Sequence, residues 1–132
     1  MNHRKSEIGF AAGVFDIHGS LRILISDQEG EYASEPSLYA KITAKNVKLM
    51  KFLQLFDAVV GPSSGGQFRA KWKDENAFRF LKLILPYLIV KKEQAEIGIE
   101  FWENRLQAPQ TKDTAKEFKV RLSLLKKDDL DE

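Results

Sequence analysis

The chain has 132 residues, the length of one compact domain, and its 43% hydrophobic content supplies a core and argues against wholesale disorder. No apolar run approaches the roughly 20 residues of a membrane-spanning helix, and residues 1–7 lack the apolar stretch of a signal peptide. Zero cysteines exclude disulfides and thiolate metal sites. We therefore expect an intracellular protein without a membrane partner, in the cytoplasm or an organelle. The net charge of +2 does not by itself suggest nucleic acid, although the middle of the chain is basic.

The first predicted element is a helix over residues 7–17, whose apolar side chains cover most of its surface. Its middle consists of the small residues Ala11, Ala12 and Gly13, which allow a second backbone to come close. Gly13 costs roughly 1 kcal/mol relative to alanine in a helix interior, so we expect a contact that compensates for it. Gly19 is expected to end the helix, because glycine tolerates the left-handed conformation that often follows a helix end.

Two strands are predicted next, over residues 20–26 and 37–43, where the side chains alternate as in a half-buried strand. The segment between them, residues 27–36, is a long hairpin loop with four acidic side chains to which we assign no role. A helix follows Asn46, a suitable N-cap. The sequence Gly-Pro-Ser-Ser-Gly-Gly at residues 61–66 is expected to form a turn or loop.

The second half is predicted to contain a short strand, a strand over residues 67–72 with a basic outer face, and then helices. Asp74 is the expected N-cap of a helix that Pro86 ends. Two more helices are expected at about 92–103 and 111–126. We find no internal repeat and no domain boundary, so 1–132 is predicted to be one domain with a core at about 7–105.

Strands joined by hairpins, with helices grouped elsewhere, predict an α+β domain with an antiparallel sheet and helices on one face, in the core order αββαββα. The other face carries basic and hydrogen-bonding side chains, as in β-ribbons that read the DNA major groove; a merely solvated surface is the alternative. Lys45, just before the following helix, and Lys48 on that helix suit phosphate contacts. The complete predicted DNA-binding set is Arg22, Ser26, Tyr39, Lys41, Lys45, Lys48, Gln67, Arg69 and Lys71.

Residues 10–21, Phe-Ala-Ala-Gly-Val-Phe-Asp-Ile-His-Gly-Ser-Leu, resemble the LAGLIDADG motif of homing endonucleases, whose motif helices pack together and carry the catalytic acid at their ends. Residues 38–56 look like the second strand and following helix of that family. Residues 80–95 are similar to its segment "fL…pyL..Kk.Qa". Each stretch alone is a weak signal, but their order and spacing make the resemblance fairly specific.

The resemblance implies a site-specific endonuclease that cuts double-stranded DNA at a long pseudo-palindromic site. Since we find one motif, it implies a homodimer in which Ala11, Ala12 and Gly13 face the same residues of a second subunit. Packing of this helix only within its own domain is the alternative.

The resemblance also places His18 where the family has its catalytic carboxylate. The family cleaves DNA with magnesium ions, whereas an imidazole nitrogen is a softer ligand. One interpretation is a degenerate site that binds DNA and cuts slowly or not at all. The other is that His18, with the backbone of Ile17, binds Mg²⁺ or Mn²⁺, or that His18 serves as a general base. Asp16 is expected to point elsewhere, about 200° around the helix axis.

Lys91 matches a family lysine that lies close to the scissile phosphate, so the predicted catalytic residues are His18 and Lys91. Ala44 stands where the family often has a polar residue. Three other functions stay open: a DNA-binding module without cleavage, a maturase that binds its host intron RNA, and an unrelated α+β interaction domain. The DNA target, the host compartment and the location of the gene inside or outside an intron cannot be read from the sequence.

Overall fold

The computed structural model describes residues 3–25, 35–107 and 112–130, without the side chains of 112 and 128–130. The predicted Ser26 and nearly all of the loop at 27–36 lie outside the described residues. The elements in chain order are α1 (Lys5–His18), β1 (Gly19–Leu24), β2 (Ser37–Ala44), α2 (Val47–Gln54), β3 (Val59–Pro62), η2 (Ser64–Gly66), β4 (Phe68–Lys73), α3 (Glu75–Ile84), η3 (Leu85–Tyr87), α4 (Lys92–Gln107) and α5 (Lys112–Leu130).

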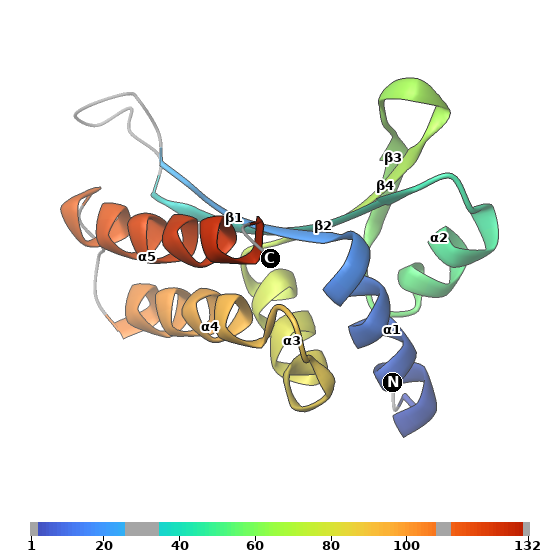
Figure 1. Ribbon diagram of the computed structural model, residues 1–132, viewed down its shortest axis with the longest axis horizontal. Helices are drawn as coiled ribbons and strands as arrows, with labels where there is room; N and C mark the ends of the chain where they lie inside the picture. Colours follow the sequence, from blue (N-terminus) through green and yellow to red (C-terminus); the bar gives the residue numbers. More distant parts are fainter. Residues whose placement is uncertain (1–2, 26–34, 108–111, 131–132) are drawn as a thin grey trace.

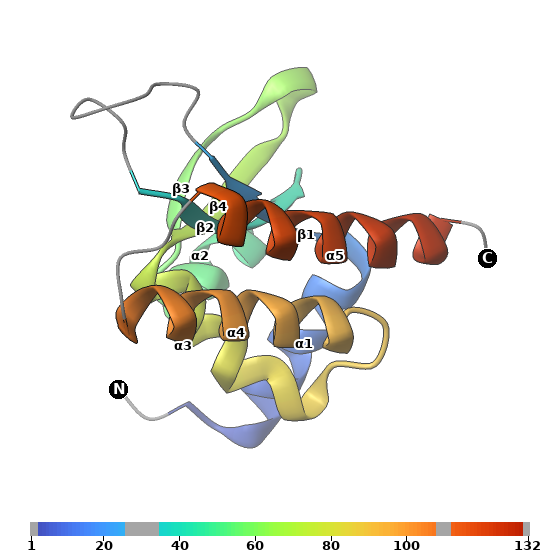
Figure 2. The same cartoon turned by 90° about the vertical axis from the view of Figure 1, so that its left-hand side faces the viewer.

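The four strands form one antiparallel sheet in the order β1-β2-β4-β3. The helices lie on one side of this sheet, which curves so that its other face is open and concave (Figure 1). Helices α4 and α5 run side by side near β1 (Figure 2), whereas α2 lies near β3 and β4 at the opposite end of the molecule (Figure 1). The predicted α+β class and the helix-covered antiparallel sheet are thereby confirmed. No helix in the described part of the chain is long and apolar enough to cross a membrane.

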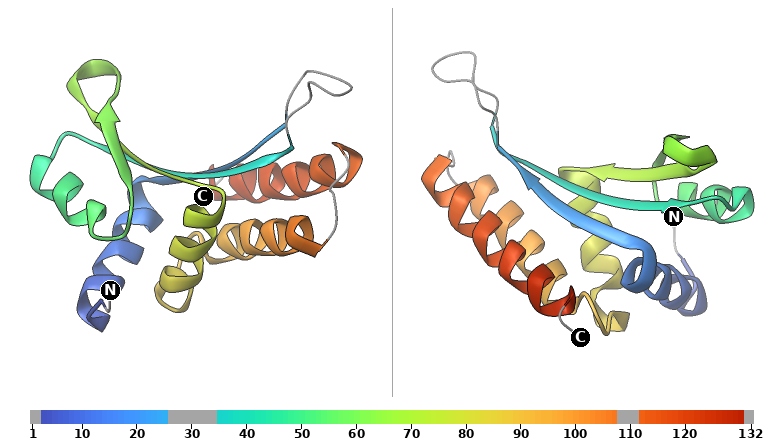
Figure 3. Two further views of the ribbon diagram at one scale, coloured as in Figure 1. Left: turned by 180° about the vertical axis from the view of Figure 1, so that it is seen from behind. Right: turned by 45° about the horizontal axis from the view of Figure 1, so that its top comes forward.

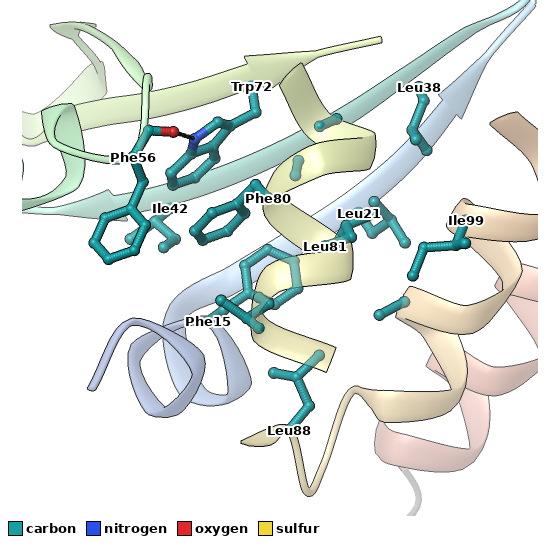
Figure 4. Close-up of a cluster of buried hydrophobic side chains, with 14 of the residues drawn as sticks. Phe15, Leu21, Leu38, Ile42, Phe56, Trp72, Phe80, Leu81, Leu88 and Ile99 are labelled. Atoms are coloured by element: carbon teal, nitrogen blue, oxygen red, sulfur yellow. Dashed lines mark hydrogen bonds between the residues drawn. The ribbon is translucent and has the colours of Figure 1, made fainter. Parts of the chain in front are cut away.

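An aromatic cluster joins the sheet to the helices in the middle of the core (Figure 4). The ring of Trp72 on β4 stacks on Phe80 of α3 with 3.8 Å between ring centroids. Its indole Nε1 donates a hydrogen bond to the carbonyl oxygen of Phe56 at 2.9 Å. Phe15 of α1 meets Phe80 edge to face. Because burial of large aromatic rings dominates core energetics, this cluster fixes α1 and α3 beneath the sheet.

Gly19 ends α1, but for a different reason than the one predicted. Its φ of −81° and ψ of 158° are extended, so the left-handed conformation is not used. A Cβ atom at this position would lie 2.5 Å from the carbonyl oxygen of Phe15. Glycine is therefore required because the chain turns from helix to strand in close contact with the last helical turn.

The two predicted N-caps have different outcomes. Asn46 caps α2, since its side-chain oxygen accepts a hydrogen bond from the Leu49 amide at 3.0 Å. Asp74 precedes α3 but makes no cap with its side chain. Its Oδ1 accepts instead from the Leu38 amide at 3.0 Å, and its own amide donates to the Leu38 carbonyl at 2.7 Å. Asp74 thus ties the start of β2 to the β4–α3 connection.

Gly61 and Pro62 belong to strand β3 rather than to the predicted turn. β3 is an edge strand of the described sheet, where proline is tolerated because one side of the strand needs no partner. The predicted strand at 67–72 is shifted by one residue, to Phe68–Lys73, and α5 continues to Leu130.

Candidate nucleic-acid interface and cleavage centre

The open face of the sheet is formed by the outward side chains of all four strands, and it is basic. Along β1, β2 and the second half of β4, buried and less buried residues alternate, so every second side chain faces outward, and the register places Val59 and Gly61 of β3 beside outward residues of β4. None of these outward residues is acidic, and five are arginine or lysine. The outward set is Ser20, Arg22, Leu24, Ser37, Tyr39, Lys41, Thr43, Val59, Gly61, Arg69, Lys71 and Lys73.

The register places the charged side chains in rows across the strands. Arg22, Tyr39 and Lys73 occupy one row, and Lys41 and Lys71 are partners in the next. A hollow of about 210 Å³ lies on this face. Its lining residues are Ser20, Arg22, Leu24, Tyr39, Lys41, Arg69 and Lys71.

Tyr39 holds two of the cations without neutralising them. The Nζ atom of Lys71 is 5.1 Å from the centre of the Tyr39 ring, and that of Lys73 is 5.6 Å away. A ring face attracts an ammonium group but carries no net charge. The positive charge of both lysines therefore remains available to an anion above the sheet.

The structure groups most of the predicted DNA-binding residues on one surface. Those on the open face are Arg22, Tyr39, Lys41, Arg69 and Lys71. Lys45 and Lys48 are exposed just after β2 and on α2, and Gln67 is half-buried immediately before β4. Lys73 was missed because the strand was predicted to stop at residue 72. The alternation that identified Lys71 would have identified it too.

Asp16 anchors the segment before α4 to the end of α1. It is 8% exposed, and its carboxylate accepts hydrogen bonds from three consecutive amides. Oδ2 accepts from Ile89 at 2.9 Å, and Oδ1 accepts from Val90 at 3.1 Å and from Lys91 at 2.9 Å. The Asp16 side chain is thus directed at the backbone of residues 89–91, beside the end of α1 where His18 is exposed.

Lys91 is held at that same helix end. Its Nζ donates a hydrogen bond to the backbone carbonyl of Asp16 at 2.6 Å, and its side chain is half-buried. His18 lies two residues further along α1 and is exposed. Lys91, which follows His18 after 72 intervening residues in the chain, is thus held at the helix end that carries His18.

The donor groups at this helix end fit a magnesium ion poorly. Both carboxylate oxygens of Asp16 are occupied by amides, and its carbonyl oxygen is taken by Lys91. Within the described ranges, no three His, Cys, Asp or Glu side chains gather closely enough to hold a metal. One imidazole and the Ile17 carbonyl do not supply the hard oxygen set that Mg²⁺ prefers.

The residues exposed on α1 differ from those predicted to meet a second subunit. Ala11 and Ala12 are both 0% exposed, so they pack within the domain, and this burial removes them from the predicted interface. Gly13 is exposed, with no neighbouring atom within 4 Å of where a Cβ would lie. Phe10 and Ile17 are exposed at helical spacing on either side of Gly13, at 56% and 75%.

No family model matches this sequence, and no curated protein is significantly similar to it. Solved structures, in contrast, match across most of the chain. The homing endonuclease I-CvuI, in complex with the I-CreI target, superposes with a TM-score of 0.79 at 16% identity, over 92% of this chain and 82% of its own. The archaeal intron-encoded homing endonuclease I-Vdi141I, complexed with DNA, gives 0.74 at 16% identity, over 95% and 85%.

The I-SmaMI LAGLIDADG homing endonuclease, bound to cleaved DNA, gives a TM-score of 0.72 at 16% identity over 92% of this chain but only 43% of its own. Our chain thus corresponds to less than half of that protein and to most of the other two. I-CvuI was studied with magnesium and with calcium. The fold is one that other proteins use in DNA complexes. More particularly, it is the fold of the LAGLIDADG homing endonucleases, as the sequence resemblance predicted.

Proposed function

We propose that this chain is a site-specific double-stranded DNA endonuclease of the homing type, which binds its site through the open sheet face. The single observation that carries the proposal is the concave face of the sheet (Figure 3), whose outward strand positions hold five cationic and no acidic residues. Lysine and arginine contacts to phosphates supply most of non-specific DNA affinity. The hydrogen-bonding side chains between them can read base edges in the major groove.

The surface around α1 supports a homodimer. A glycine at position 13 costs helix stability, and nothing in the described domain requires it. A second helix packed closely against Gly13 would supply the reason. Ile89 and Val90, which Asp16 holds beside the end of α1, add exposed apolar surface at 86% and 56%. A two-fold axis would place the same patch on both subunits and two sheets along one pseudo-palindromic DNA site.

His18 and Lys91 are the residues available for cleavage. Hydrolysis requires a water molecule to attack phosphorus while the bond to the leaving oxygen breaks. A neutral imidazole can accept the proton of that water as a general base. An ammonium group beside the phosphate stabilises the charge that develops on its oxygens. The leaving oxygen takes its proton from solvent.

A second candidate function is DNA binding of the same kind without cleavage. It is favoured by the donor set at the end of α1, which lacks a free carboxylate where the resemblance places the catalytic acid. Under this alternative, His18→Asp restores an oxygen ligand and creates magnesium-dependent cleavage that the natural protein lacks.

The two candidates are tested with a duplex selected by the purified protein from a randomised library. The selected duplex is incubated with protein and Mg²⁺, Mn²⁺ or a chelator. We expect a double-strand cut that His18→Ala and Lys91→Ala abolish while binding persists, and the condition that permits cutting shows whether a metal ion takes part. If the protein binds the duplex but cuts it under none of these conditions, DNA binding without cleavage is the function that remains. Failure to bind any duplex overturns both, and displacement of duplex by intron RNA would favour a maturase.

A further inference from the structure

The C-terminal helix brings one more cation to the centre of the molecule. Helix α5 packs on α4 and on β1, which is an edge strand of the described sheet. Its inward side chains follow helical spacing and are buried or partly buried: Ala115, Phe118, Leu122 and Leu125. Lys126 comes one turn after Leu122 and is half-buried, so it points inward rather than into solvent.

The last described turn of α5 lies beside β1, close to the point where α1 gives way to that strand (Figures 1 and 3). Because α5 packs on β1, the half-buried Lys126 lies near the edge of the sheet to which Arg22 belongs. Burial lowers the pKa of Lys126, and the charges of Arg22, Lys41 and Lys91 lower it further. Arg22 and Lys41 belong to the open face, and Lys91 belongs to the cleavage centre.

We propose that Lys126 binds the DNA phosphate nearest to Lys91, and so joins the sheet face to the cleavage centre as one continuous anion site. This inference rests on the proposed function. A lysine held beside three other cations is unfavourable for the free protein. A phosphate placed among the four cations converts that repulsion into attraction, because each charge then faces an opposite one. The contact positions the DNA backbone and carries no sequence information.

The test compares Lys126→Met with Lys127→Met in binding to a mixed-sequence duplex, with fluorescence anisotropy measured over a series of salt concentrations. Lys127 is the matched control, since it is adjacent but exposed on the outer side of α5 with Val120 and Leu124. We expect Lys126→Met to reduce the slope of log affinity against log salt by about one for each chain bound. Lys127→Met should leave that slope unchanged, and Lys126→Arg should largely retain it.

Thermal unfolding separates this role from a structural one. Removal of a crowded charge should leave the melting temperature of Lys126→Met equal to or above that of the natural protein. If the melting temperature and the DNA affinity of Lys126→Met both fall, Lys126 supports the fold, and the proposal is overturned.

The pH dependence gives an independent readout. The charges that act on the pKa of Lys126 are those of Arg22 from β1, Lys41 from β2 and Lys91 before α4, while Glu100 on α4 is paired with Arg121. Phosphate binding raises the lowered pKa of Lys126, so the complex takes up a proton at a pH between the lowered value and the ordinary value of about 10.4. Affinity in that window therefore falls as pH rises, and the fall is smaller in Lys126→Met. If the natural protein binds DNA and Lys126→Met binds it with the same affinity, salt slope and pH dependence, this inference alone is overturned. If neither protein binds DNA, the proposed function is overturned.

Discussion

At the scale of single residues, Asp16 shows how the site is assembled. Its carboxylate lies at the end of one helix and caps three amides just before another, so it fixes Lys91 beside Asp16, which precedes His18 by two residues in α1. Three of the roughly four acceptor sites of this carboxylate are used by amides, and the residue is 8% exposed, so it is poorly placed to bind a metal or activate water as well. The proposed chemistry at this helix end therefore depends on His18 and Lys91, and Asp16 holds the backbone of Lys91 in place.

Asp16→Ala is predicted to destabilise the fold by about 2 kcal/mol, because three amides lose a charged acceptor and only part of that loss is recovered from water. The stability of Asp16→Asn should lie between those of the natural protein and Asp16→Ala, since the asparagine amide group keeps one acceptor oxygen. Urea denaturation followed by circular dichroism measures both. Glu103→Ala, at an exposed position of α4, is the control and should change stability little. An Asp16→Ala protein as stable as the natural one would show that these hydrogen bonds contribute nothing net.

At the scale of elements, α1 has two sides with different tasks. Ala11, Ala12 and Phe15 face the core and are fully buried. Phe10, Gly13 and Ile17 face outward, although an isolated domain gains nothing from an exposed glycine between two exposed apolar residues. The outer side of this helix therefore carries the proposed contact with a second subunit.

Gly13→Ala is predicted to change the monomer and the dimer in opposite directions. Alanine should stabilise the isolated chain by up to about 1 kcal/mol through helix propensity, since its methyl group meets no atom in the domain. The same methyl group should weaken close helix packing across the dimer. Light scattering over a range of concentrations measures the association, and thermal unfolding of dilute protein measures the stability. Ser123→Ala, exposed on α5, is the control and should leave the association unchanged, whereas an unchanged association of Gly13→Ala would contradict the proposed interface.

At the scale of the whole molecule, the sheet separates two environments. Its covered face carries the apolar core, and its concave face collects cations from strands that are far apart in the chain. The nearly neutral total charge hides this arrangement, because the acidic residues lie elsewhere than on the outward strand positions. DNA affinity should consequently depend on the charges of this face rather than on net charge.

Lys71→Gln is predicted to weaken binding to duplexes of any sequence and to reduce the salt slope by about one for each chain bound. Lys119→Gln removes the same charge from the exposed outer side of α5 and is the control. Filter binding at several salt concentrations measures both. Equal effects of the two substitutions would show that binding follows net charge and not the open face.

The amino-acid pattern by itself determined the element types, the antiparallel sheet and the basic outward residues. Each of these depends on a local periodicity or on a cap such as Asn46, and such local patterns can be recognised directly in the sequence. The nomination of His18 and Lys91 came from the resemblance to a family motif.

Only the tertiary structure decided how these parts meet. Alternation could not reveal that Asp16 reaches the amides of residues 89–91, that Ala11 and Ala12 are buried inside the domain, or that α5 returns Lys126 to the centre. Asp74 and Gly19 were assigned local roles, but their actual roles follow from contacts with Leu38 and Phe15. The physical reason is the same in each case: the partner lies across the fold, and a one-dimensional pattern records only what lies within a few residues.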